Sequence, residues 1–155
     1  MKNILVGLLF LLTNSLLLCQ SIQLNTFDAL LDALNNGKNV RVIIHYSKCR
    51  LTIDGKEEKA PDTIGGMDFK AFEFFSKGSV NNNKAFISSS QTVLISHTHY
   101  GYVNNYIKIR IYEDNSVAII ARYLDPKTFD IKMDETFHSY INDNQNDAAV
   151  FLFTD

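Results

Sequence analysis

Apolar and polar side chains alternate along much of the chain, and this two-residue period predicts β-strands. The alternation is clearest where Ile107, Ile109 and Ile111 are separated by polar or tyrosine residues. Short turn sequences such as Asp114-Asn115 and Asp125-Pro126 lie between the apolar segments, so neighbouring strands are expected to pair as hairpins. The predicted strands cover residues 40–46, 69–75, 85–89, 92–98, 106–112, 117–124, 129–134 and 149–153.

A period of three to four residues predicts one helix before the first strand, over residues 27–36. Its apolar stripe consists of Phe27, Leu30, Leu31 and Leu34. Asn25 or Thr26 precedes the helix and can accept hydrogen bonds from its first backbone N–H groups. Gly37 follows the helix, and glycine readily adopts the left-handed conformation that ends a helix.

The order of these elements predicts an α+β domain. We expect one N-terminal helix packed on a curved antiparallel β-sheet, or on a small closed β-barrel, with the strands connected as a meander. The helix would cover one face or one open end of the sheet. The pair Gly65-Gly66 indicates a bulge, a tight bend or a close approach of the backbone to a neighbour.

The first residues have the three parts of a cleavable secretory signal peptide. Lys2 supplies a positive charge, residues 4–12 are almost wholly apolar, and small or polar residues at 19–21 suit cleavage. Thr13-Asn14-Ser15 interrupts the apolar run, which disfavours a retained membrane span. Cys19 also suggests a bacterial lipoprotein, but the Leu18 that precedes it is larger than the residue this processing requires.

This pattern predicts a signal peptide over residues 1–21 and a single domain over residues 22–155. We expect the protein to be secreted and extracellular, or periplasmic if the source is Gram-negative, with no membrane span after cleavage. The formal charge of the whole chain is −2. Nucleic-acid binding requires clustered basic residues, so no nucleic-acid partner is expected.

His97-Thr98-His99 is the sharpest local candidate for a site. Residues two apart on a strand point to the same face, so His97 and His99 are placed to share a zinc or copper ion. A third ligand would have to be His45 or His138, and nothing in the sequence brings these histidines together. The alternative is two partly exposed histidines that bond to tyrosines or water, and no other cofactor is expected.

Cys49 is the only cysteine left after signal cleavage, so no intrachain disulfide is expected. It is either a buried, small apolar side chain, an interchain disulfide partner or a reactive thiol. Lys48 and Arg50 would favour a thiolate, but neighbours on a strand point to the opposite face. A secreted metal- or thiol-dependent enzyme using His97, His99 and Cys49 is therefore the alternative function.

Tyrosines are concentrated in the middle of the chain. A tyrosine ring with its polar hydroxyl suits a binding surface, although tyrosine is also common on half-buried sheets. The leading hypothesis is a secreted, non-catalytic binding or interaction protein that presents a tyrosine-rich strand face or a barrel mouth to an unknown extracellular ligand or protein. The candidate ligand-binding residues are Tyr100, Tyr102, Tyr106 and Tyr112.

Residues 26–50 resemble the start of the VirK protein family, with the helix at 27–34, Gly37, and a strand that ends in Ser47-Lys48-Cys49. Further similarity lies in Ile64-Gly65-Gly66 and in the turn at 112–117. The resemblance implies a small exported protein, of a family first described in bacterial virulence regulons, with no established enzymatic activity and no catalytic residues to transfer. It also implies a structural or redox role at Cys49.

Overall fold

The protein is described by a computed structural model that covers residues 21–155. The predicted signal peptide over residues 1–21 lies outside the described residues except for its last position. Of the described residues, 54% lie in strands and 9% in helices. Within this part of the chain, no helix is both long enough and apolar enough to span a membrane.

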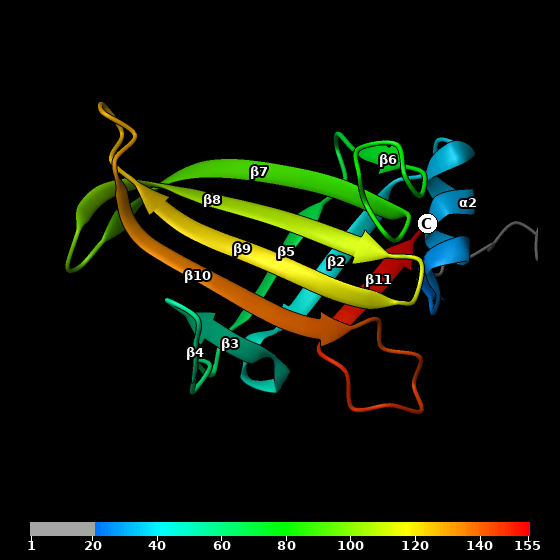
Figure 1. Cartoon of the computed structure of the whole chain (residues 1–155). Coiled ribbons are helices and arrows are strands. Elements are labelled where there is room, and N and C mark those ends of the chain that lie inside the picture. Colours follow the sequence, from blue (N-terminus) through cyan, green and yellow to red (C-terminus); the bar gives the residue numbers. More distant parts are fainter. Residues whose placement is uncertain (1–20) are drawn as a thin grey trace, which may run out of the picture.

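The strands form two antiparallel sheets that lie one over the other (Figure 1). The four-stranded sheet has the order β1 (Ile22–Leu24), β11 (Val150–Thr154), β2 (Val40–His45) and β5 (Ile64–Asp68). The seven-stranded sheet has the order β4 (Lys56–Glu58), β3 (Arg50–Ile53), β10 (Ile131–Tyr140), β9 (Ser116–Leu124), β8 (Gly101–Tyr112), β7 (Phe86–His97) and β6 (Glu73–Phe75).

The predicted α+β architecture, with one helix on a single curved sheet or closed barrel, is wrong. The described residues form two separate sheets and no closed barrel. A meander pairs each strand with its neighbour in sequence, but β2 pairs with β11 from the other end of the chain. This long-range pairing creates the second sheet. Alternate residues of β2 and β11 are buried, so one face of the second sheet packs against the larger sheet.

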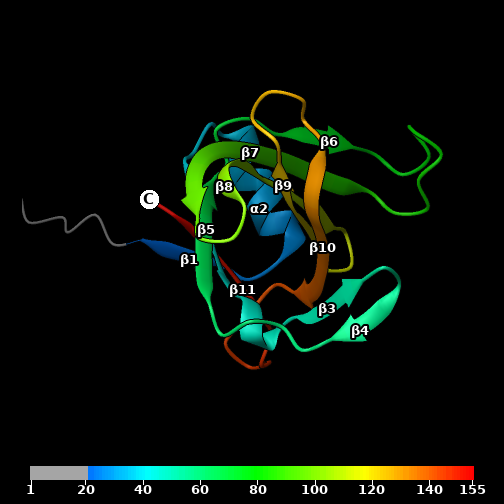
Figure 2. The same ribbon diagram turned by 90° about the vertical axis from the view of Figure 1, so that its left-hand side faces the viewer.

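The helix α2 (Phe27–Asn35) lies at one end of the two sheets and does not cover the face of either (Figure 1). Thr26 caps it by accepting a hydrogen bond from the backbone N–H of Ala29 at 3.2 Å. Its buried face consists of Phe27, Leu30, Ala33 and Leu34. In the view from the opposite end, α2 lies behind the space between the sheets (Figure 2). The helix therefore closes one end of the apolar interior.

Residues in register across three long strands form successive layers of the interior. Ile109 of β8 lies opposite Ile119 of β9, which lies opposite Phe137 of β10. The next layer toward the β7–β8 hairpin contains Ile107, Ala121 and Glu135. The layer after that contains Asn105, Tyr123 and Met133. The layers thus become more polar with distance from α2.

Gly65 and Gly66 lie inside β5, where a side chain would collide with two different neighbours. A Cβ on Gly66 would lie 2.8 Å from the carbonyl oxygen of Val42, which is backbone and cannot rotate away. A Cβ on Gly65 would lie 2.9 Å from the Tyr46 ring. The close approach that the sequence allowed is therefore present, and the strand pairing continues through both glycines.

Gly66→Ala is expected to lower the free energy of unfolding by about 1–3 kcal/mol, because the added methyl group must push β5 away from β2. Gly65→Ala is expected to cost less, since the Tyr46 ring can shift. Urea unfolding of both variants measures the difference. A Gly66→Ala variant as stable as the wild-type protein would contradict the close approach of the two strands.

Candidate functional site

A cavity of about 570 Å³ lies between the inner faces of the two sheets. The four-stranded sheet contributes Ile44, Gly65 and Met67 to its wall. The three long strands contribute Asn105, Ile107, Ala121, Tyr123, Met133, Glu135 and Phe137. Pro61, Thr63 and Ile64 border it on one side. No residue of α2 lines the cavity, whereas His97 and Tyr100 at the β7–β8 hairpin do. This hairpin and α2 lie at opposite ends of the sheets (Figure 1).

Tyr46 joins the two sheets at the inner part of this cavity. The turn Tyr46–Lys48 follows β2 and carries the chain into β3, and therefore from the four-stranded to the seven-stranded sheet. The Tyr46 ring meets the edge of Phe137, with ring centroids 4.7 Å apart. Burial raises the pKa of Tyr46 to about 12, and the nearby Cys49 adds to this shift. Tyr46 therefore stays a neutral hydrogen-bonding group.

A second group of aromatic side chains, His97, Tyr100 and Tyr123, forms the rim of the cavity at the β7–β8 hairpin. The ring centroid of His97 lies 5.0 Å from that of Tyr100 and 5.0 Å from that of Tyr123. His97 Nδ1 accepts hydrogen bonds from the backbone N–H groups of His99 and Tyr100, each at 3.2 Å. These two hydrogen bonds fix the orientation of the His97 ring at the rim.

Glu135 is the one carboxylate among the residues that line this cavity, and the lining has no lysine or arginine. Burial raises the pKa of Glu135, because the charged form is poorly solvated there. Within residues 21–155 no hydrogen bond or ion pair engages its side chain. The cavity thus combines apolar walls, aromatic rings and a single negative charge.

The predicted metal pair is divided between two environments. His97 ends β7 and faces the cavity, whereas His99 lies in the exposed turn that follows. The His45 ring packs against Phe151 in a tilted arrangement, with ring centroids 5.2 Å apart, and His138 lines a different groove. Over residues 21–155 there is no group of three or more histidine, cysteine, aspartate or glutamate side chains that could hold a metal ion. Zinc binding by His97 and His99 stays a prediction.

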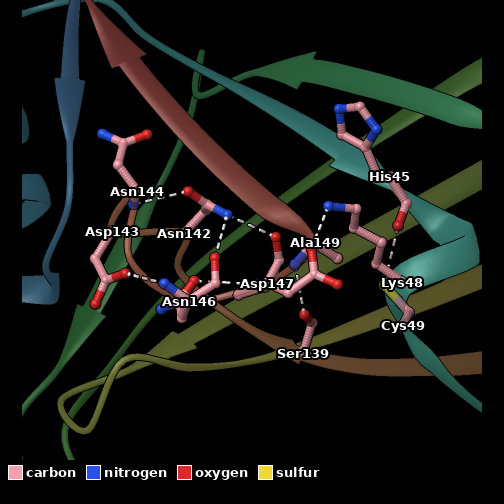
Figure 3. Close-up of polar contacts among 11 residues, drawn as sticks. His45, Lys48, Cys49, Ser139, Asn142, Asp143, Asn144, Asn146, Asp147 and Ala149 are labelled. Carbon is pink, nitrogen blue, oxygen red and sulfur yellow. Dashed lines mark hydrogen bonds and ion pairs between the residues drawn. The ribbon is translucent and has the colours of Figure 1, made fainter.

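Cys49 is a buried thiol at the end of the Tyr46–Lys48 turn. Its sulfur lies 3.9 Å from the carbonyl oxygen of His45, as Figure 3 shows. Burial raises its pKa to about 11, so the thiol is protonated at neutral pH. This environment favours the buried, structural interpretation of Cys49 over the reactive one.

The predicted tyrosine site is spread over two surfaces. Tyr100 lies at the cavity rim, whereas Tyr102, Tyr106 and Tyr112 share the outer face of β8. Tyr102 is 69% exposed. Tyr102 and Tyr112 are separated by roughly 33 Å, given a rise of about 3.3 Å per residue. Of this set, only Tyr100 lines the cavity between the sheets, whereas Tyr112 lines a separate groove.

A second, larger groove of about 810 Å³ lies outside the sheets and is lined mainly by polar residues. Lys48 pairs with Asp147 across it, as Figure 3 shows, and Asp114 pairs with Lys84. These charges neutralise one another locally. The cavity between the sheets is the better candidate for a ligand site, because ligand sites are mostly apolar with a few convergent polar groups.

Sequence reasoning missed Tyr46, Glu135 and Phe137 as parts of a site. The position of Glu135 could have been recognised from the sequence, because it alternates with the apolar residues Met133 and Phe137 along one strand and so shares their inward face. A carboxylate on the apolar side of such a strand indicates a functional or paired group. Tyr46 has no comparable signal, because its inward direction depends on the turn between the two sheets.

The two antiparallel sheets and the partly polar cavity between them identify the chain as a small, β-rich protein. The sequence profile of the VirK protein family matches residues 23–129, which is more than half of the chain. The chain therefore belongs to the VirK protein family, and the resemblance seen in the sequence is confirmed.

The fold is also similar to that of a solved structure, the crystal structure of lpg1832, a VirK family protein from Legionella pneumophila. The two have a TM-score of 0.64 and 15% sequence identity over 85% of this chain and 98% of that one. At this identity the likeness shows the shared fold alone. No curated protein matches the sequence at a significant level.

Proposed function

We propose that this protein is a secreted, non-catalytic binding protein, and that its ligand site is the cavity between the two sheets. The observation that carries the proposal is the composition of the cavity wall. Ile44, Met67 and Ile107 offer apolar surface, while the Tyr46 and Tyr123 hydroxyl groups can orient a ligand. A cavity of about 570 Å³ is in the range that small-molecule sites occupy, roughly 300–1,000 Å³.

The same features favour binding over catalysis. Burial holds the Cys49 thiol protonated, and the His97 Nδ1 atom is already occupied by two backbone N–H groups. A nucleophile with an adjacent general base would be needed for covalent catalysis. The alternative, a metal- or thiol-dependent enzyme that uses His97, His99 and Cys49, has no observation in its favour beyond the residues themselves.

Ala121→Leu is expected to weaken binding of the uncharged apolar probe N-phenyl-1-naphthylamine by on the order of tenfold. Ala121 lies in the middle layer of the cavity wall, so a larger side chain would occupy ligand space. Overfilling a packed site typically costs about 1–3 kcal/mol, and about 1.4 kcal/mol corresponds to a tenfold change in affinity. A fluorescence titration measures both dissociation constants.

Ala118→Leu is the matched control, because Ala118 lies on the opposite face of the same strand and points away from the cavity. It is expected to leave the probe affinity unchanged. Methyl NMR gives a second measurement, in which Ile44 and Ile107 should shift on binding and the outward Ile43 should not. The proposal is wrong if the probe shows no saturable binding, or if it perturbs the outer methyl groups instead.

A further inference from the structure

We infer that the ligand of the cavity between the sheets is an alkylammonium ion, whose positive head lies beside Glu135 and whose alkyl chain lies along the apolar inner faces of the sheets. This inference rests on the proposed binding function and specifies the chemical class of the ligand. The observation that carries it is the composition of the wall, where, among the described residues, Glu135 is the single carboxylate, no lysine or arginine is present, and several aromatic rings line the same cavity.

The position of Glu135 makes its charge available to a ligand. It lies in the middle layer, opposite Ala121 of the neighbouring strand, and is half-buried there. Tyr46 lies close enough for the Glu135 carboxylate to contribute to the raised pKa of the phenol. A carboxylate that is partly removed from water is stabilised by a positive partner, and a cationic ligand would supply that partner.

The aromatic side chains around Glu135 suit the same ligand. Tyr46 and Phe137 meet edge to face at 4.7 Å on the inner side, and Tyr100 and Tyr123 lie with ring centroids 6.0 Å apart at the rim. Cations are attracted to the faces of aromatic rings, and pockets that recognise alkylammonium groups combine several such rings. His97 stands at the rim, where its Nδ1 atom accepts hydrogen bonds from two backbone N–H groups.

No lysine or arginine of residues 21–155 lines this cavity. Lys56 and Lys59 line an adjoining groove that Glu135 also borders. Within the described chain neither lysine forms an ion pair with the Glu135 carboxylate. The negative charge therefore faces the cavity without a cation from the protein itself.

The test compares two ligands of nearly equal shape that differ in charge. The probes are 6-hydroxyhexyl-trimethylammonium and its uncharged isostere 7,7-dimethyloctan-1-ol, each titrated against bound N-phenyl-1-naphthylamine. The decisive quantity is the ratio of their dissociation constants. Glu135→Gln is expected to reduce the preference for the cation by on the order of tenfold, because it removes the carboxylate that pairs with the positive head and leaves the aromatic rings in place.

Glu57→Gln is the matched control, because Glu57 is an exposed carboxylate on β4 that does not line the cavity. It should leave the ratio unchanged. If both compounds displace the probe but Glu135→Gln leaves the ratio as in the wild-type protein, the inference is overturned and the binding function stands. If the naphthylamine probe itself fails to bind, the proposed function fails and this inference falls with it.

Discussion

Phe137→Ala is expected to lower the free energy of unfolding by about 3–5 kcal/mol, the range for removing a large buried aromatic side chain. Phe137 is 2% exposed and is the largest fully buried side chain described. It packs between Ile119 of its own sheet and Tyr46 at the turn that leaves the other sheet. Phe137 also lines the cavity between the sheets, so the space left by its ring would add to that cavity and would not be refilled by neighbouring side chains.

The measurement is urea unfolding, with Tyr140→Ala as the control on the same strand. Tyr140 is 58% exposed, so removing its ring should change stability by about 0.5 kcal/mol or less. Phe137→Leu should give an intermediate loss, because leucine refills part of the volume. Equal stability of the Phe137→Ala and Tyr140→Ala variants would show that Phe137 does not join the two sheets.

Asn142→Asp is expected to lower the free energy of unfolding by about 3 kcal/mol at neutral pH, because it exchanges a buried donor for a charged acceptor. Asn142 is 5% exposed. Its Nδ2 donates to the carbonyl oxygens of Asn146 and Ala148 at 3.2 and 2.9 Å, and its Oδ1 accepts from the backbone N–H of Asn144 at 2.9 Å (Figure 3). A carboxylate would face two carbonyl oxygens.

The effect of this substitution should depend on pH. The introduced carboxyl group can donate again once it is protonated, so its folded pKa would lie above the unfolded value of about 3.9. The variant should therefore recover stability as the pH falls toward 4, and should lose it as the pH rises. Asn144→Asp is the matched control, since the described structure uses only the backbone N–H of that residue. A pH-independent loss in Asn142→Asp would contradict the assigned hydrogen bonds.

Local patterns predicted most of the elements. The helix begins after Thr26 and ends before Gly37, as the apolar stripe and the capping residues predicted. The alternating segment around Ile109 is a strand with its isoleucines turned inward. Successive side chains of a strand point to opposite faces, so an alternating sequence shows which side chains share the buried face. The segment at 69–75 was placed less well, because only Glu73–Phe75 is strand.

The architecture could not be predicted in the same way. A two-residue period shows which face of a strand is buried, but it does not show which strand lies beside it. Val42 lies opposite Leu152, a residue from the far end of the chain, and this pairing divides the strands between two sheets. The single-sheet prediction failed because it assumed that strands close in sequence are also close in space.

In the candidate site, too, some features follow from the local sequence and others only from the tertiary structure. The sequence by itself determined the membership of the VirK family, the helix and the inward positions of most strand residues, because each depends on local residue order. The tertiary structure alone decided that Tyr46, Tyr123 and Glu135 line one cavity. These residues come from the turn between the sheets and from two long strands, and only the packing of one sheet against the other brings their side chains together.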